Sequence, residues 1–207
     1  MTGGTKRVLD LVGAAVGLLV LAPLLAVLWL AVRATSPGPA LFRQQRLGRG
    51  EHPFIMYKFR SMRAGSADAI HRAYVRRMLT EDPPAGDGPG GLFKLQADPR
   101  VTPVGRFLRR SSLDELPQLY NVLRGDMSLV GPRPVLDWEA ELFSASARAR
   151  FSVRPGLTGL WQVSGRNRLT MPQALELDVE YVRRQSLWLD LAILARTLPA
   201  QFRRGTA

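Results

Sequence analysis

The chain has 207 residues, 46% of them apolar, and carries 29 Lys and Arg against 17 Asp and Glu, for a net charge of +12. This composition excludes an intrinsically disordered chain and gives enough length for one domain with a buried core. The absence of cysteine excludes disulfides, thiolate metal sites and a cysteine nucleophile, and two histidines are too few for a histidine-rich metal site. The basic excess favours a polyanionic partner, which is nucleic acid, an anionic membrane face or a phosphorylated substrate.

The first element is a nearly unbroken apolar run over residues 8–32, which is long enough to cross a bilayer as one helix. Pro23 lies near its middle, where it removes an intrahelical hydrogen bond and clashes with the preceding turn. A bend at Ala22-Pro23 would leave legs of about 14 residues, roughly 21 Å long, which enter a ~30 Å bilayer core without crossing it. The preferred prediction is a re-entrant helix, and a single spanning helix is the alternative.

Charges at the two ends of this run support re-entry. Basic residues flank both ends, and the positive-inside tendency draws both ends to the cytoplasmic side. Asp10, two residues inside the run, is tolerable if it stays near the lipid headgroups. The flanking basic residues are Lys6, Arg7, Arg33, Arg43 and Arg46.

Short strands are expected after the membrane element. Residues 35–39 (TSPGP) form a turn that ends it. Residues 40–43 and 54–59 are predicted strands, separated by a turn at residues 48–50. The spacing over residues 66–79 predicts a basic amphipathic helix, which either lies in the membrane interface or is solvated on a soluble core.

The last predicted helix carries a stripe of apolar side chains at helical spacing, with arginines on its flanks. Such a stripe usually faces the core, and this is the preferred interpretation. The aromatic and arginine content makes seating at a membrane interface the alternative. The stripe consists of Trp188, Leu191, Ala192, Ala195, Leu198 and Phe202.

The segment SSLDELPQL at residues 111–119 is the most informative part of the chain. With Asp114 as an N-cap, Pro117 falls at the third helical position, where its missing N–H has no partner to lose, and Gly125 ends the helix. A carboxylate there meets unpaired N–H groups that also attract phosphate, and adjacent Asp114 and Glu115 suit Mg²⁺. Taken alone, the same segment also fits a capping aspartate followed by a solvated glutamate.

Basic side chains recur throughout the chain and favour a phosphate and metal site at Asp114 and Glu115 over a simple helix cap. Phosphoryl transfer relies on positioning and charge stabilisation, for which arginine side chains and a metal ion are suited. Residues 131–134 (GPRP) and 154–159 (RPGLTG) are rigid loops that each hold an arginine in place, and a duplex-binding protein needs no such loops. The recurring basic residues are Arg43, Arg46, Lys58, Arg60, Arg106, Arg109, Arg133, Arg154 and Arg166.

Together these segments resemble the monotopic phosphoglycosyl transferases, bacterial sugar transferases that begin glycan assembly on a lipid carrier. The resemblance covers nearly the whole chain, and several long motifs in order are far more specific than any one of them. The matching segments are KRxxD at residues 6–10, SPGPALFRQQRLGRG at 36–50, FIMYKFRSM at 54–62, DPRVTPVGRFLRRSSLDELPQLYNVLRGDMSLVGPRP at 98–134, RPGLTGLWQVSGRN at 154–167 and LELDVEYV at 175–182.

The resemblance implies an α/β fold, with a compact mixed core of short strands, an N-terminal re-entrant membrane helix and interfacial amphipathic helices. It divides the chain into a membrane helix-hairpin over residues 1–35 and a catalytic domain over residues 36–207. It also implies a monotopic protein of the bacterial inner membrane, with its active site on the cytoplasmic face. The chain is expected to be the minimal form, without the multi-span N-terminal domain of larger relatives.

The implied activity is the transfer of a sugar 1-phosphate from a UDP-sugar to polyprenol (undecaprenyl) phosphate, with release of UMP, as the first membrane step of exopolysaccharide assembly. The family's nucleophile maps to Asp114, which would carry a covalent phosphosugar, and its dyad partner maps to Glu115, with Mg²⁺ held by the pair. Asp178 matches an acidic motif position and is expected to contact residues of the site without contacting the substrate. The candidate nucleotide or phosphate contacts are Lys58, Arg60, Arg133, Arg154 and Arg166.

One departure concerns the membrane break, where many relatives have Ser-Pro and this chain has Ala22-Pro23. The serine hydroxyl that could satisfy freed backbone carbonyls is therefore missing, and the sharpness of the bend is less defined. The expected partners are the UDP-sugar, the polyprenol phosphate and a membrane with anionic lipids, without nucleic acid. The sequence leaves the sugar and a homo-oligomer open, and the competing hypothesis is a membrane-tethered polyanion-binding scaffold without catalysis.

Overall fold

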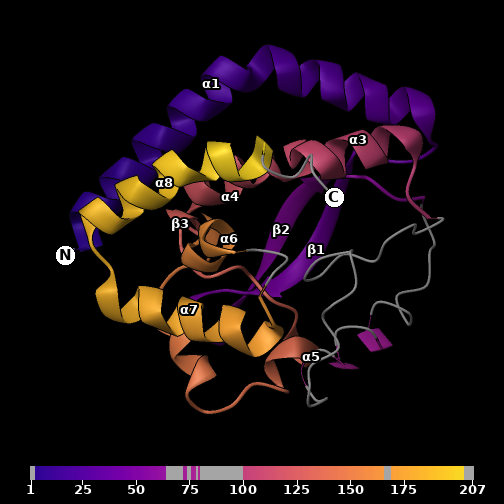
Figure 1. Ribbon diagram of the computed structural model, residues 1–207. Coiled ribbons are helices and arrows are strands. Elements are labelled where there is room, and N and C mark those ends of the chain that lie inside the picture. Colours follow the sequence, from indigo (N-terminus) through magenta and orange to yellow (C-terminus); the bar gives the residue numbers. More distant parts are fainter. Residues whose placement is uncertain are drawn as a thin grey trace.

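Helices make up most of the structure, and its described strands form two separate two-stranded sheets (Figure 1). The computed structural model describes residues 3–63, 72–73, 76–77, 79, 100–165 and 169–202, so the helix predicted over residues 66–79 lies largely outside the described residues. The elements are α1 (Gly3–Thr35), β1 (Leu41–Leu47), η1 (Arg49–Glu51), β2 (Pro53–Phe59), α3 (Pro103–Ser111), η2 (Leu113–Glu115), α4 (Gln118–Arg124), β3 (Ser128–Val130), α5 (Asp137–Ala140), η3 (Ala147–Ser152), β4 (Gly156–Thr158), α6 (Leu160–Ser164), α7 (Met171–Arg184) and α8 (Leu187–Phe202).

The N-terminal apolar run forms one long helix, α1, that continues through Pro23. Figure 1 shows α1 as an arch over the rest of the molecule, with a bend near its middle. Because proline lacks the N–H and crowds the preceding turn, a bend without loss of the helix is its ordinary effect. α1 is thus one continuous helix that contains Pro23 and is bent near its middle, and the re-entrant membrane hairpin over residues 1–35 stays a prediction.

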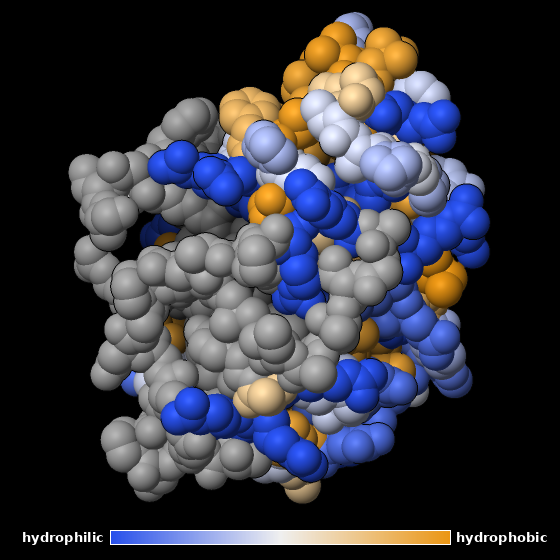
Figure 2. Space-filling model, turned by 90° about the vertical axis from the view of Figure 1, so that its right-hand side faces the viewer, coloured by the Kyte–Doolittle hydropathy of each residue, from blue (hydrophilic) through white to orange (hydrophobic). Residues whose placement is uncertain are grey.

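One face of α1 packs on the protein, while the opposite face is apolar and exposed. The packed stripe includes Ala14, Leu28 and Val32, whereas Leu19 is 77% exposed and Val20 is 70% exposed. Within the described residues, α1 is the one helix long and apolar enough to cross a membrane. Figure 2 shows hydrophobic side chains gathered at the top of the molecule, above hydrophilic ones. A helix that is apolar on its outward face needs an apolar medium against that face.

The start of α1 is attached to the protein by charged side chains. The Lys6 Nζ lies 2.7 Å from the Asp190 carboxylate on α8 and 3.0 Å from the carbonyl oxygen of Val130 on β3. Arg7 donates to two carbonyl groups near the end of α4, at 2.7 and 2.8 Å. Asp10 is buried and accepts a hydrogen bond from a backbone N–H of β3 at 2.9 Å. β3 thus satisfies this carboxylate inside the protein, and the depth of Asp10 near the lipid headgroups stays a prediction.

The far end of α1 rests on the same body through apolar contacts. Leu28 and Val32 belong to a buried cluster with Ala40, Phe59 and Leu108, which come from the loop before β1, from β2 and from α3. Both ends of α1 are thus seated on one folded unit, the first by ion pairs and hydrogen bonds and the second by apolar packing.

Strands β1 and β2 form an antiparallel hairpin with Phe42 opposite Lys58. The two predicted strands are confirmed and are longer than expected, and the turn between them contains Gly50 with a positive φ of 67°. The side chain of Asn121 on α4 pairs with the outer edge of β2, accepting from the N–H of Tyr57 at 3.1 Å and donating to the carbonyl of Ile55 at 2.7 Å. This amide takes the place of a third strand and fixes the hairpin against α4.

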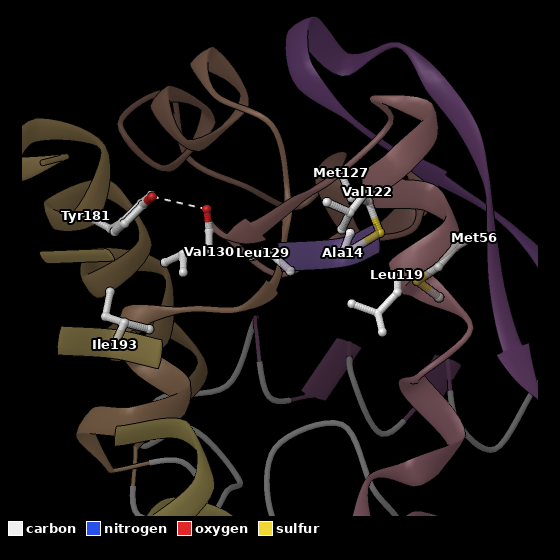
Figure 3. Close-up of a cluster of buried hydrophobic side chains, with 9 residues drawn as sticks. All are labelled: Ala14, Met56, Leu119, Val122, Met127, Leu129, Val130, Tyr181 and Ile193. Atoms are coloured by element: carbon white, nitrogen blue, oxygen red, sulfur yellow. Dashed lines mark hydrogen bonds between the residues drawn. The ribbon is translucent and has the colours of Figure 1, made fainter. Parts of the chain in front are cut away.

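A central apolar cluster joins α1 to the elements below it (Figure 3). Tyr181 of α7 is buried in this cluster and donates from its hydroxyl to the carbonyl of Val130 at 3.1 Å and to Asp190 at 2.7 Å. Burial and the Asp190 carboxylate raise the pKa of Tyr181, so the phenol remains a donor. The cluster consists of Ala14, Met56, Leu119, Val122, Met127, Leu129, Val130, Tyr181 and Ile193.

The second sheet is a short parallel pair, β3 and β4, which brings the two predicted rigid loops together. A Cβ on Gly131 would stand 2.5 Å from the carbonyl oxygen of Arg154, and a Cβ on Gly156 or Gly159 would collide with the backbone of Gly131. Only glycine permits this approach, so the GPRP and RPGLTG loops pack backbone against backbone.

The orientation of α8 differs from the preferred prediction. Trp188 is 80% exposed and Leu191, Ala192 and Ala195 are also exposed, whereas Ile193 is buried. The core-facing assignment of that stripe is therefore wrong for these four residues, since α8 carries apolar side chains on two faces. The buried face is fixed by a polar residue, Asp190, which Lys6 and Tyr181 bind.

Candidate active site

The two acidic residues Asp114 and Glu115 lie in a tight turn between α3 and α4. Ser112 ends α3 with a left-handed backbone, φ 56°, and redirects the chain into the one-turn helix η2. Gly125 ends α4 with φ 95°, as predicted, but Pro117 directly precedes α4 and does not occupy the third helical position that was predicted for it. The prediction that Asp114 caps this helix is wrong, because i to i+3 hydrogen bonds form a separate turn first. The helix-terminus argument for its charge therefore does not apply.

Side chains from three elements converge at this turn. Glu115 Oε1 lies 3.6 Å from Nζ of Lys58, which comes from β2, and 3.3 Å from Nη1 of Arg133, which comes from the loop after β3. Asp114 is 6% exposed beside this carboxylate. The structure thus brings together four of the predicted site residues, two carboxylates and two cations.

Burial and the charged neighbours of Lys58 change the pKa of its ammonium group. Burial lowers the pKa of Lys58 to about 8, against the opposing effect of Glu115, and the positive charges of Arg133 and Arg46 add to the lowering. Lys58 is therefore a cation at neutral pH that loses its proton more readily than an ordinary lysine.

Arg46 is a further basic residue at the site, and it was absent from the predicted set of phosphate contacts. Its Nη1 lies 3.5 Å from Glu139 Oε2 and 3.4 Å from the carbonyl oxygen of Pro134. The signal that could have found it is strand alternation, because Arg46 and Phe42 lie on the same face of β1, and Phe42 is opposite Lys58.

Two other predicted phosphate contacts are engaged elsewhere. Arg60 is buried and donates from Nη2 to the carbonyl and hydroxyl oxygens of Ser36, at 2.7 and 2.8 Å, which fixes the turn after α1. Arg154 donates from Nε to the carbonyl of Gly125 at 2.9 Å, at the end of α4. Arg166 lies outside the described residues. For these three residues, a contact with nucleotide or phosphate stays a prediction.

Asp178 on α7 lies behind the site in a buried ion pair. Its Oδ2 is 2.7 Å from Nη2 of Arg150, and both side chains are almost fully buried. Arg150 in turn donates to the backbone carbonyl of Arg133. Burial raises the pKa of Asp178 to about 6, and the charge of Arg150 opposes this rise. Arg150 has no counterpart among the predicted site residues, since nothing local in the sequence pairs it with a residue on α7.

The donor set at the turn fits Mg²⁺ only in part. The described residues contain no group of three or more His, Cys, Asp or Glu that could hold a metal ion without help. Asp114 and Glu115 offer hard carboxylate oxygens, and Mg²⁺ typically takes one or two carboxylates together with substrate phosphates. The pair therefore suits a magnesium ion that arrives with, or is completed by, a phosphate group.

Comparison with known proteins places the chain among sugar transferases. Residues 1–204 match the family described as "Bacterial sugar transferase". The chain is 44% identical over 202 residues to undecaprenyl-phosphate galactose phosphotransferase of Salmonella typhimurium, covering 98% of this chain and 41% of that protein. It is 45% identical over 203 residues to UDP-glucose:undecaprenyl-phosphate glucose-1-phosphate transferase of Caulobacter vibrioides, covering 94% and 68%.

A shorter relative matches along most of its own length. The exopolysaccharide production protein ExoY of Rhizobium meliloti is 41% identical over 198 residues, which cover 96% of this chain and 85% of that protein. Several other relatives are longer, and the chain spans about two fifths of their length, 41% for the galactosyl transferase CpsE of Streptococcus agalactiae. The chain belongs to the bacterial sugar transferase family.

Proposed function

We propose that this protein transfers a sugar 1-phosphate from a UDP-sugar to undecaprenyl phosphate or a similar polyprenol phosphate and releases UMP. The observation that carries the proposal is the buried Asp114 beside Glu115, with the cations Lys58 and Arg133 held against that second carboxylate. Two relatives are named as enzymes that use undecaprenyl phosphate, one with galactose and one with UDP-glucose. A site with carboxylates and fixed cations suits the transfer of a phosphoryl group.

In the first step, an Asp114 carboxylate oxygen attacks the phosphorus atom that bears the sugar. A bond forms between that oxygen and phosphorus while the bond from phosphorus to the UMP oxygen breaks, and UMP leaves with the electron pair. An oxygen of the polyprenol phosphate then attacks the same phosphorus atom and expels Asp114 as a free carboxylate. Two displacements through a covalent intermediate replace one difficult ternary reaction.

Lys58, Arg46 and Arg133 stabilise the negative charge that develops on the phosphoryl oxygens. Glu115 holds Lys58 and Arg133 before substrate arrives. Asp114 and Glu115 would hold Mg²⁺ together with the diphosphate, and the ion would supply charge neutralisation. We expect EDTA to abolish UMP release and added Mg²⁺ to restore it.

The membrane arrangement that we propose is re-entrant, with the site on the cytoplasmic face. A helix that crosses the bilayer has its ends separated by a hydrocarbon core of about 30 Å. Both ends of α1 are instead seated on one folded unit, through Lys6 and Asp10 at the start and Leu28 and Val32 at the end. The exposed apolar face between them is then the part that enters the lipid.

Cysteine labelling tests this topology without background, because the chain has no cysteine. The variants Gly4→Cys and Arg49→Cys place one thiol before the apolar run and one after it, both at exposed positions. A membrane-impermeant maleimide should reach both from the cytoplasmic side of oriented vesicles. Labelling from opposite sides would establish a spanning helix instead.

The decisive test of the chemistry is Asp114→Asn. We expect this variant to lose UMP release from UDP-sugars in the presence of polyprenol phosphate and Mg²⁺, while an exposed carboxylate elsewhere, changed by Asp137→Asn, has no effect. Intact-protein mass measurement after incubation with donor alone should show a phosphosugar adduct on the wild type and none on Asp114→Asn. Full turnover by Asp114→Asn would disprove the nucleophile and favour a direct displacement, whereas a wild type that releases no UMP would favour a membrane-tethered polyanion-binding scaffold.

The sugar is proposed to be a hexose without an N-acetyl group. The names of the matched relatives specify galactose and glucose. UMP release should therefore be faster with UDP-galactose or UDP-glucose than with the matched UDP-N-acetylhexosamines at equal concentration. Preference for an N-acetylated donor would overturn the sugar class while leaving the phosphoryl transfer intact.

A further inference from the structure

The loop that carries Arg133 is held from behind through its backbone carbonyl groups. Nη2 of Arg150 donates to the carbonyl oxygen of Arg133 at 2.5 Å. Nη1 of Arg46 lies 3.4 Å from the carbonyl oxygen of the next residue, Pro134. Two arginines therefore hold neighbouring peptide groups of a loop whose own arginine side chain points to Glu115.

Each of these arginines is seated on a buried carboxylate. Asp178 binds Arg150 at 2.7 Å, and Glu139 lies 3.5 Å from Arg46. The Arg150 guanidinium also lies near the rings of Phe143 and Phe151, 5.3 and 5.8 Å from their centroids. An arginine held by a carboxylate and two aromatic rings has little freedom to move.

The backbone of the loop is also restrained by its contact with residues 154–156 and by its own prolines. Gly131 packs against the backbone of residues 154–156 so closely that a Cβ could not be added, and prolines on both sides of Arg133 stiffen its backbone. A shift of the Arg133 carbonyl would therefore carry over to the position of its guanidinium beside Glu115.

We propose that Arg150, held by Asp178, is a positioning residue that sets the Arg133 guanidinium in place for the phosphoryl transfer proposed above. Arg150 contacts no reacting atom in this scheme and acts only through Arg133. The alternative is that the pair stabilises the fold and nothing more. The two roles are separable, because a buried ion pair can be replaced by apolar residues of similar volume without loss of stability.

The test replaces the pair as a unit, with Arg150→Met and Asp178→Leu in one chain. We expect this double variant to remain folded with a Tm near that of the wild type. We also expect its kcat for UMP release to fall by about 10²-fold, the scale of a misplacement of about 1 Å at a reacting centre. The KM for the UDP-sugar should change much less. Wild-type kcat in the folded double variant would show that the pair is only structural.

A double-mutant cycle tests the route through Arg133. If Arg150 acts only by placing that guanidinium, then the Arg150→Met and Asp178→Leu replacement should cause no further loss in an Arg133→Ala background. If the fold-losses in kcat caused by Arg133→Ala and by the double replacement instead multiply in the combined variant, Arg150 acts independently of Arg133 and this route is excluded.

Arg148→Met is the matched control, because Arg148 also joins a carboxylate, on Glu51, to a backbone carbonyl, on Ala140. Its ion pair is exposed, and its hydrogen bonds go to Glu51 and Ala140, not to the Arg133 loop. This variant should keep wild-type kcat and KM.

Hydrogen–deuterium exchange of peptides covering residues 128–136 gives a readout that does not depend on turnover. Exchange should be faster in the double variant than in the wild type or Arg148→Met. Unchanged exchange would overturn the proposal that Arg150 restrains the Arg133 loop, whether or not the chain releases UMP. A wild type that releases no UMP would instead refute the proposed function, so the two failures are distinguishable.

Discussion

Two charged groups contact the GPRP loop, one through the Arg133 side chain and one through its carbonyl oxygen, and they differ in solvent exposure and in the length of their contacts. Around Glu115 the nitrogen–oxygen distances are 3.3 and 3.6 Å, and the three side chains are 15% to 20% exposed. Between Arg150 and Asp178 the distance is 2.7 Å, and the side chains are 2% and 3% exposed. The first group stays accessible to an incoming phosphate, whereas the second is closed to solvent and joined by a short contact, with Arg150 Nε and Asp178 Oδ1 buried without hydrogen-bond partners among the described residues. Removal of one partner should therefore lower stability far more at the closed pair than at the open group.

The largest expected effect is on stability at the closed pair. Arg150→Met leaves the Asp178 carboxylate buried without its partner, and such a loss costs about 3–5 kcal/mol of unfolding free energy. Arg133→Met, at the open group, should cost no more than about 1 kcal/mol. Denaturant unfolding of the detergent-solubilised protein measures both. Equal losses at the two positions would remove the distinction between an open and a closed group.

The next effect is on catalysis at the open group. Glu115→Gln should reduce kcat for UMP release by about 10²-fold or more, because Lys58 and Arg133 lose the charge that holds them together. The unfolding free energy should change by no more than about 1 kcal/mol, since these side chains are partly exposed. Steady-state kinetics together with unfolding curves measures the split. A variant that unfolds easily but turns over normally would reverse the comparison.

The pH dependence of activity sharpens the comparison at Lys58. Its pKa of about 8 means that the ammonium is charged below this pH and neutral above it. We therefore expect kcat/KM to fall as pH rises through about 8, approaching tenfold for each further unit. Because the Glu115 charge raises the pKa of Lys58, Glu115→Gln should move this decline to lower pH.

Lys58→Arg is the control for that profile. Arginine stays protonated throughout this pH range, so the decline above about pH 8 should disappear even if the absolute rate is lower. A decline at the same pH in Lys58→Arg would assign the titration to another group.

The smallest effect is expected at an exposed pair on the same segment as Arg150. Arg148 and Glu51 are each 40% exposed, and Arg148→Met should change the unfolding free energy by less than about 1 kcal/mol. Activity should not change. A loss as large as that of Arg150→Met would mean that burial does not separate these two ion pairs.

Much of the local structure could be predicted from short-range patterns. The two strands that flank the Gly48–Gly50 turn and the end of α4 at Gly125 are confirmed. Alternation and a glycine stop signal are properties of neighbouring residues, so they can be read without knowing the fold. The effect of Pro23 inside α1 belongs to the same class, because proline bends a helix locally.

What could not be predicted depends on partners that are distant in the sequence. Asp10 is buried because β3 binds it, and the buried face of α8 is the one with Asp190 because Lys6 binds that carboxylate. Arg150 is held by a contact with Asp178 on another element. The turn at Asp114 was missed for a different reason, since residue spacing does not separate a single 3₁₀ turn from the first turn of an α-helix.

The contact between the GPRP and RPGLTG loops has a consequence for anyone who exchanges parts between relatives. Three glycines let these loops meet backbone to backbone, so neither loop has an independent shape. A chimaera that imports one loop with a larger residue at Gly131, Gly156 or Gly159 would force the two apart and displace Arg133 with them. For protein engineering, the two loops are therefore one transferable module, although 19 residues separate Pro134 from Arg154 in the sequence.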